Sequence, residues 1–179
     1  PAAIAQVTAD AQPLIRNADE LHDAMLSRIL LPISEAVPWT REFAELVRDG
    51  RATVVRRSTD SRAPEDAWAA TERIPAVLAA FPDATLEPPV SIPADVRRDW
   101  ECTDARVAMV RGLLEICGPI NPIAAADRIG ITESQAQAAL EALEGEGVVL
   151  RGPNDPRVLT SPRAVFMPEQ GRYWKHQVR

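Results

Sequence analysis

Residues 104–151 constrain the fold of this chain most strongly, because three helical patterns follow one another there between clear turn signals. The first pattern repeats apolar residues every three or four positions, as one face of an amphipathic helix does. Its apolar residues are Val107, Val110, Leu113, Leu114 and Cys117. Gly118 and Pro119 follow, and proline ends a helix because it cannot continue the hydrogen-bond ladder.

Two further helices are predicted after this stop, each with its own capping residue. Asn121 caps the second, and Pro122 takes the first helical position, where a missing N–H costs nothing. Thr132 caps the third, with Gln135 placed to complete a capping box. The side chains expected to face inward are Ile123, Ala126 and Ile129 in the second helix and Ala136, Leu140 and Leu143 in the third.

A strand is predicted to follow the third helix. Gly145 and Gly147 end the helix, and Val148, Val149 and Leu150 begin the strand. Three short helices followed by a β-rich segment predict a winged helix-turn-helix over residues 101–152. Domains of this architecture bind nucleic acid or partner proteins.

The charge of this segment bears on which of the two it binds. A helix that recognises DNA bases offers Arg, Lys, Asn or Gln to the base edges, but the predicted third helix contains no Arg or Lys. Residues 101–152 hold eight acidic and four basic side chains, a net charge of −4. Phosphates are repelled by such a surface, which favours a structural or protein-contacting role over sequence-specific recognition.

Residues 1–82 are predicted to form a separate helical domain that contains a β-hairpin. Asn17 caps its first helix with Glu20 as the capping-box partner, and Pro32 ends that helix. Trp68 faces inward from the second strand of the hairpin. The expected elements are helices at 17–31, 39–48 and 72–81 and strands at 51–57 and 66–71.

Two segments carry no clear periodicity. Residues 83–100 are rich in proline and are predicted to be a strap or linker. Residues 153–179 are predicted to be an irregular tail. The fold class expected for the whole chain is therefore α+β and mostly helical, with a small helix and hairpin domain before the winged helix.

Candidate nucleic-acid-binding residues cluster in the first domain. Two tryptophans offer rings on which bases can stack. The arginines offer either phosphate contacts or an ordinary solvated face, and the tryptophans are equally open to a role in the core. These residues are Arg48, Arg51, Arg56, Arg57, Arg62, Trp39 and Trp68.

No catalytic constellation emerges from the sequence. His22 lies within one helical turn of Asp19 and Asp23, which suits either acid–base chemistry or, more commonly, a local structural pairing. Gln135 and Gln137 point about 200° apart on a helix, so they do not converge on a flipped base. No catalytic, cofactor-binding or metal-binding residue is assigned.

Composition limits the remaining function classes. The net charge of −6 argues against nonspecific adhesion to nucleic acid, and no apolar run is long enough to cross a membrane. The two cysteines, Cys102 and Cys117, suit a reducing compartment, so we expect a cytoplasmic protein. The chain opens on Pro1 without a Met, and we expect it to be a piece of a longer protein.

The order of these motifs resembles the region that follows the two motor domains in Lhr-type large helicase-related proteins of superfamily 2. The resemblance covers roughly residues 1–152. It is carried by the motifs DELHD at 19–23, GRA at 50–52, WAATER at 68–73 and LEGEGVVLRG at 143–152. The tail departs from the Trp-Cys-containing, Arg-rich helical segment of that family.

The resemblance implies an accessory domain of an ATP-dependent DNA helicase linked to DNA repair. Its partners would be single-stranded DNA or an RNA–DNA hybrid, together with the motor domains of the same protein. ATP and Mg²⁺ would serve those motor domains, because this chain has neither a P-loop motif nor a DExH box. The alternative is a winged-helix regulator or scaffold module that binds protein partners through its acidic face.

Overall fold

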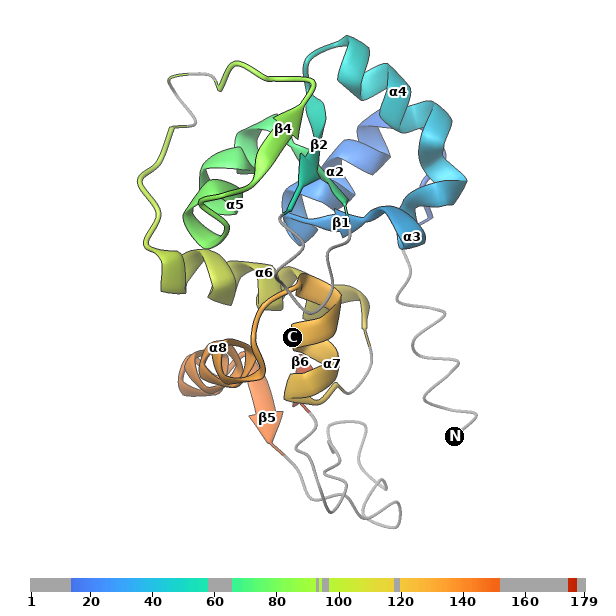
Figure 1. Ribbon diagram of the computed structural model, residues 1–179. Helices are drawn as coiled ribbons and strands as arrows, with labels where there is room; N and C mark the ends of the chain where they lie inside the picture. Colours follow the sequence, from blue (N-terminus) through green and yellow to red (C-terminus); the bar gives the residue numbers. More distant parts are fainter. Residues whose placement is uncertain are drawn as a thin grey trace. The chain divides into compact units, whose positions relative to one another are not determined.

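The structure is a computed structural model that describes residues 14–57, 66–92, 94, 97–117, 120–151 and 174–176. It has the α+β architecture expected from the sequence, with helices predominating over a small antiparallel sheet (Figure 1). The chain divides into two compact units, and the boundary falls within one helix, between Met109 and Val110. Each unit is described by itself.

The first unit, Pro13–Met109, is built around a four-stranded antiparallel sheet in the order β1-β3-β2-β4. Its strands are β1 (Leu31–Pro32), β2 (Ala52–Arg56), β3 (Ala67–Ala70) and β4 (Thr85–Glu87). Its helices and 3-10 turns are α2 (Ala18–Arg28), α3 (Ile33–Ala36), η1 (Val37–Trp39), α4 (Thr40–Arg48), η2 (Thr71–Arg73) and α5 (Ile74–Ala80).

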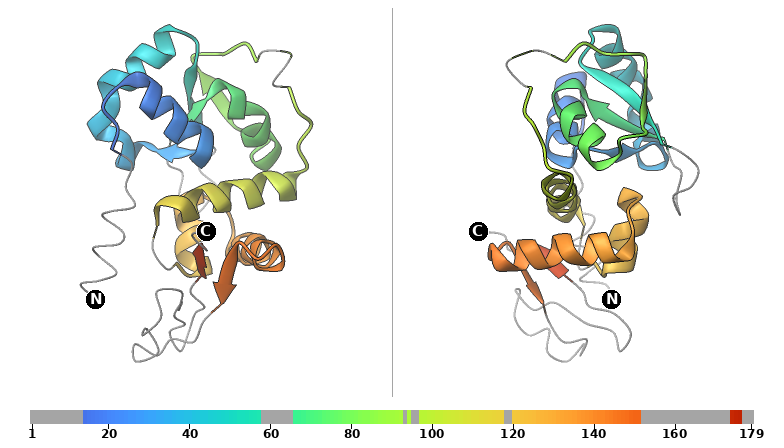
Figure 2. Two further views of the ribbon diagram at one scale, coloured as in Figure 1. Left: turned by 180° about the vertical axis from the view of Figure 1, so that it is seen from behind. Right: turned by 60° about the vertical axis from the view of Figure 1, so that its left-hand side comes forward.

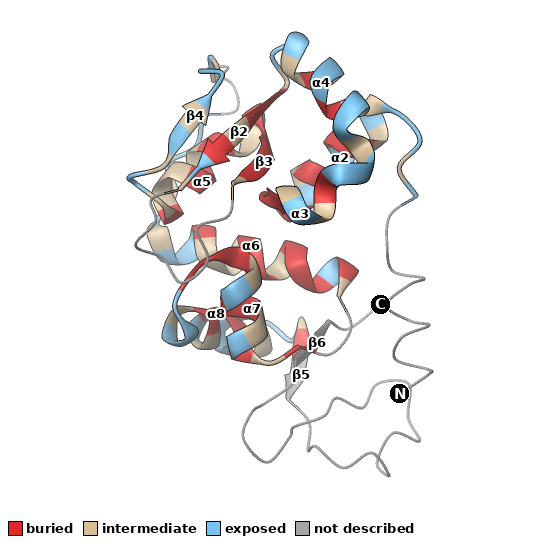
Figure 3. Ribbon diagram, turned by 45° about the vertical axis from the view of Figure 1, so that its right-hand side comes forward, coloured by how far each residue is buried: buried red, intermediate tan, exposed pale blue. Residues whose placement is uncertain are grey.

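The sheet is covered on both faces. Every residue of β3 is buried, which requires protein on either side of the strand. In Figures 1 and 2, α2 and α4 lie to one side of the strands and α5 lies to the other. Residues of α2, α3, α4 and the strands form one apolar cluster: Leu21, Met25, Leu31, Ala36, Phe43, Leu46, Ala52, Trp68 and Ala70. Figure 3 shows that these helices and strands carry buried segments.

The predicted hairpin and its helices are confirmed. β2 and β3 pair antiparallel with Val54 opposite Trp68. The Asn17 side chain accepts a hydrogen bond from the Glu20 N–H at 2.9 Å and so caps α2. Glu20 does not return that bond to Asn17; its carboxylate instead accepts from the Arg16 N–H at 2.7 Å.

Two strands of the sheet were not expected. The helix that begins after Asn17 ends at Arg28 rather than at Leu31, and Leu31 and Pro32 form β1, which pairs with β3. The predicted strap contains β4, which pairs with β2 through Val55 and Leu86. Both strands are short and one contains proline, so only their distant partners make them strands.

Ile29 produces the sharp turn between α2 and β1. Its φ is 67° and its ψ is −52°, and the Leu30 N–H donates to the Arg28 carbonyl at 2.8 Å. This geometry is that of a classic γ-turn, which is rare and strained. A β-branched residue at positive φ is a steric outlier, and here the Ile29 side chain is buried.

The described part of the second unit from Val110 onward combines helices with one antiparallel pair. Its elements are the end of α6 (Cys102–Ile116), α7 (Pro122–Ile129), α8 (Glu133–Gly145), β5 (Val149–Arg151) and β6 (Trp174–His176). β5 pairs antiparallel with β6. The tail is therefore not irregular throughout, because residues 174–176 form a strand.

The predicted helix caps of this unit are confirmed. The Asn121 side chain accepts from the Ala124 N–H at 2.8 Å, and Gly130 ends α7 at a φ of 82°. Thr132 and Gln135 form a complete capping box at the start of α8. The identification of these elements as a winged helix stays a prediction.

One inward-facing assignment is wrong. Ile123 is 45% exposed, and the buried face of α7 is formed by Pro122, Ala125, Ala126 and Ile129. That set follows the i, i+3, i+4, i+7 spacing of one helix face, from which residue 123 is rotated by about 100°. In α6, likewise, Val107 is half-buried while Met109 lies in the core, and Cys117, directly after the helix, is also half-buried.

Candidate nucleic-acid interface

Helix α4 places one face in the core of the first unit and the other in solvent. The Thr40 hydroxyl donates to the Val37 carbonyl at 2.8 Å where the helix begins. Phe43 and Leu46 are buried one turn apart. The opposite face carries Arg41 and Arg48, which are both exposed and lie seven residues, or about two turns, apart.

Trp68 belongs to the core rather than to a binding surface. Its ring stacks on Phe43 with 3.8 Å between the ring centroids and 3° between the planes. Only 4% of the residue is exposed. A base cannot stack on this ring in the folded protein, so the structure corrects the candidate role of Trp68.

Trp39 keeps part of its surface accessible. It is the residue before α4 and packs against the apolar cluster while remaining only partly buried. Val37, beside it, is 63% exposed. The start of α4 therefore offers accessible apolar surface.

Arg51 is held by two residues of α2. Its Nη1 donates to the Asp19 carboxylate at 2.6 Å, and its Nη2 lies 3.1 Å from Nδ1 of His22. The other ring nitrogen of His22 lies 3.1 Å from the Glu72 carboxylate. His22 thus pairs with neither of the carboxylates that the sequence placed beside it, Asp19 and Asp23, and is buried in a structural network.

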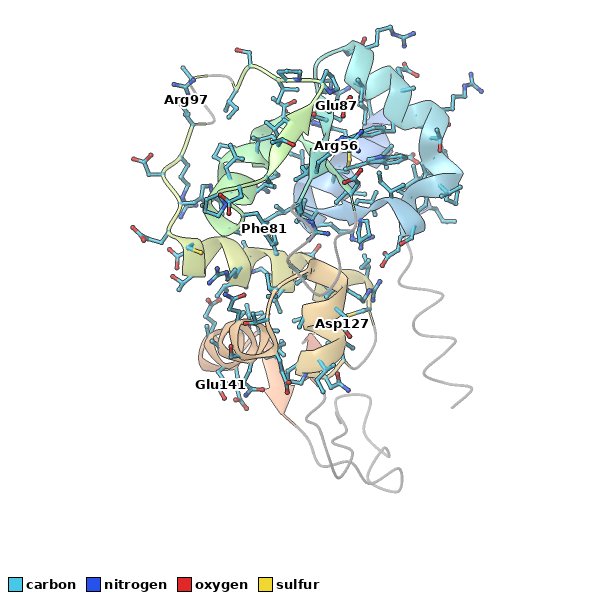
Figure 4. All side chains as sticks on the ribbon, viewed as in Figure 1. Arg56, Phe81, Glu87, Arg97, Asp127 and Glu141 are labelled. Carbon is cyan, nitrogen blue, oxygen red and sulfur yellow. The ribbon has the colours of Figure 1, made fainter. Side chains whose placement is uncertain are left out.

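Arg56 is similarly occupied. Its guanidinium donates to Asp66 at 2.6 Å and to Glu87 on the adjacent strand β4. Figure 4 labels Arg56 and Glu87 on these two strands. The hydrogen bond to Glu87, followed by the charges of Glu87 and Asp66, raises the pKa of Arg56 above its ordinary value. Two carboxylates against one guanidinium leave this corner of the sheet net acidic.

The remaining predicted arginines do not form one patch. Arg57 lies over the Phe81 ring at 5.2 Å from its centroid, so it has a different environment from Arg56. Arg48 lies 3.8 Å from Asp49 at the exposed end of α4. Arg62 lies outside the described residues. Of the five arginines, the described structure leaves Arg48 as the most accessible.

Arg41 was missed because it lies before the arginine-rich run. It is exposed and, within the part of the chain that the structure describes, makes no ion pair. The signal was present in the sequence, since Arg41 and Arg48 are seven residues apart in the predicted helix 39–48. That spacing places two side chains on the same helix face.

An open pocket of about 400 Å³ lies between the start of α2 and the solvent face of α4. Its lining mixes three arginines with four carboxylates, so it presents no single charge. The lining residues are Arg16, Asn17, Ala18, Asp19, Arg41, Glu42, Glu45, Asp49 and Arg51.

The exposed side of α8 is acidic, as the sequence indicated. Glu133 and Glu141 are exposed, and Gln137 donates to Glu141 while Gln135 is engaged in the helix cap. Figure 4 labels Glu141 on α8 and Asp127 on α7. This helix therefore offers no cation to a phosphate or a base.

Other classes of site find no support in the described residues. No group of three or more His, Cys, Asp or Glu side chains is placed to hold a metal ion there. Within the same residues, no helix has the length and apolar character needed to span a membrane.

Comparison with known protein families found no family model that matches the chain, and comparison with curated proteins found none with significant similarity.

Proposed function

We propose that this chain is an accessory module, without catalytic activity, of an ATP-dependent superfamily 2 helicase of the Lhr type. In this proposal the solvent face of α4 contacts single-stranded DNA or the strand of an RNA–DNA hybrid. The motor domains of the parent protein bind ATP and Mg²⁺. The module acts in the cytoplasm, which is consistent with a cysteine content of only two, Cys102 and Cys117.

The observation that carries the proposal is the pair of exposed arginines on α4. Arg41 and Arg48 lie on one helix face about 10 Å apart along the axis, and both are accessible to phosphates. Arg51 and Arg56, by contrast, are engaged with carboxylates. Trp39 adds partly accessible aromatic surface at the start of the same helix, which suits stacking of an unpaired base.

The second unit supports an accessory role for the chain. We assign α6, α7, α8 and the β5–β6 pair to a winged helix, because three helices are followed by an antiparallel pair in the order that this fold requires. The helix that would enter the major groove in a DNA-reading member, α8, is acidic. We therefore infer that the unit does not recognise base pairs.

Fluorescence anisotropy with a labelled single-stranded oligonucleotide tests the proposal. Arg41→Ala/Arg48→Ala should abolish most of the salt-sensitive binding and lower the salt slope by about 0.7 for each phosphate that α4 no longer binds. The matched control, Arg56→Ala/Arg111→Ala, removes two arginines that already pair with carboxylates. An equal reduction of binding in both variants would contradict a specific role for α4.

A second candidate function follows from the acidic face of α8. This face suits a basic protein partner, and the winged helix would then serve as a scaffold or regulator. Glu133→Gln/Glu141→Gln discriminates between the two functions. It should leave oligonucleotide binding unchanged if α4 is the contact, and it should weaken association with a basic partner if α8 is the interface.

A further inference from the structure

The buried His22 connects three separate segments of the first unit. It lies on α2, is 5% exposed, and has one ring nitrogen facing Arg51 and the other facing Glu72 on η2. Both contacts measure 3.1 Å. Asp19 joins the network through Arg51, to which it is bonded at 2.6 Å.

The chemistry of Arg51 determines where the proton of His22 resides. A guanidinium has five N–H donors and no acceptor, so the Nδ1 atom that faces Arg51 must accept. A neutral imidazole that accepts at Nδ1 carries its proton on Nε2, and this proton can be donated to the Glu72 carboxylate. The network is therefore satisfied by one tautomer only.

Protonation of His22 would break one contact while preserving the other. A proton on Nδ1 would face the N–H groups of Arg51, and two positive groups would meet where one hydrogen bond had been. The contact with Glu72 would persist, because Nε2 remains a donor in the charged ring. Of these two contacts of His22, only the one with Arg51 is therefore lost on protonation.

The backbone around Arg51 limits what can move. The Thr71 N–H donates to the Arg51 carbonyl at 2.9 Å, and the Thr71 hydroxyl donates to the Gly50 carbonyl at 2.8 Å. These bonds tie the start of β2 to η2, which also carries Glu72. A change at His22 must therefore be taken up by the side chain of Arg51 rather than by its backbone.

We propose that His22 is a proton-controlled latch on Arg51. The neutral Nε2–H tautomer of His22 holds the Nη2 end of the guanidinium, and protonation of the ring releases that end. Arg51 lines the open pocket beside α4, together with Arg16 and Arg41. Four carboxylates line the same pocket: Asp19 from α2, Glu42 and Glu45 from α4, and Asp49 directly after α4. Acidification thus frees the Nη2 donors of Arg51 within this pocket, while Nη1 stays bonded to Asp19. The inference does not depend on the proposed function.

Long-range ¹H–¹⁵N correlation spectra of the full chain test the latch directly. At about pH 8 the His22 spectrum should show a bare Nδ1 and a protonated Nε2. As pH is lowered over the range in which the protein remains folded, the Arg51 guanidinium resonances should shift with the same midpoint as the His22 ring. His176→Gln assigns the ring signals, because the chain has two histidines.

Three results would overturn the proposal. The first is a protonated Nδ1 at about pH 8. The second is a His22 ring that titrates while the Arg51 resonances stay still. The third is a His22 ring that remains neutral wherever the protein is folded. The variant His22→Gln keeps a donor for Glu72 but cannot titrate, so the pH-dependent shift of the Arg51 resonances should disappear. A shift of Arg51 that persists in this variant would also reject the latch.

Discussion

At the scale of single residues, the hydrogen-bond partner of each arginine decides whether it can bind another molecule. Arg51 and Arg56 look equivalent to Arg41 and Arg48 in the sequence. In the structure, carboxylates accept hydrogen bonds from the first pair, whereas α4 presents the second pair to solvent, where Arg48 lies 3.8 Å from the carboxylate of Asp49. These partners come from residues between 10 and 32 positions away, so no local pattern reveals them.

The two tryptophans of the first unit should differ in their effect on stability. Trp68→Ala removes a buried ring that stacks on Phe43, and we expect a loss of about 3–5 kcal/mol in the free energy of unfolding. Trp39→Ala removes a partly accessible ring and should cost clearly less. Urea unfolding of both variants measures the difference, and equal losses would argue against the core assignment of Trp68.

At position 29 we expect the glycine variant to be more stable than the alanine variant, which is the reverse of the usual order. Both substitutions remove the same buried side chain apart from one methyl group, but only glycine adopts a φ of 67° without strain. We expect Ile29→Gly to be more stable than Ile29→Ala by about 1 kcal/mol. Thermal unfolding compares the two, and the usual order, with alanine more stable, would contradict the γ-turn.

At the scale of elements, local signals were sufficient for helix starts and insufficient for short strands. Asn17, Asn121 and Thr132 were predicted as caps, and each accepts the expected backbone hydrogen bond, because a cap involves residues only two or three positions apart. β1 and β4 were missed because their strand character comes from pairing with β3 and β2.

The cap of α2 provides a quantitative check at this scale. Asn17→Ala leaves the Glu20 N–H without its side-chain acceptor and should reduce stability by about 1 kcal/mol. Asn17→Asp retains an acceptor and should be close to the natural protein. Chemical denaturation measures both variants. If Asn17→Ala is as stable as the natural protein, or if Asn17→Asp loses as much stability as Asn17→Ala, this hydrogen bond contributes little.

The acidic residue Glu45 on the solvent face of α4 provides a further test of DNA binding by this helix. Glu45 is exposed in the interval between Arg41 and Arg48 and repels a phosphate bound there. Glu45→Gln should therefore tighten single-stranded DNA binding by about two- to fivefold at low salt. Glu141→Gln on α8 is the matched control. An equal gain from both changes would indicate an effect of net charge alone.

At the scale of the whole molecule, the sequence predicted the α+β class and the order of most elements. It predicted that Trp68 faces inward. It could not predict which arginines hydrogen-bond to carboxylates from distant segments, or that Ile123 is exposed. A net charge of −6 further implies that any nucleic-acid contact is confined to a local surface. We propose α4 rather than α8 as that surface, because α4 carries two exposed arginines and α8 carries none.

The most direct test of this assignment is an NMR titration of the ¹⁵N-labelled chain with a short single-stranded oligonucleotide. We expect backbone amide shifts concentrated on α4 and on the start of α2, which lines the same pocket, with α8 unchanged. Shifts concentrated on α7 and α8 with α4 unaffected would contradict it, because the acidic helix would then be the contact surface.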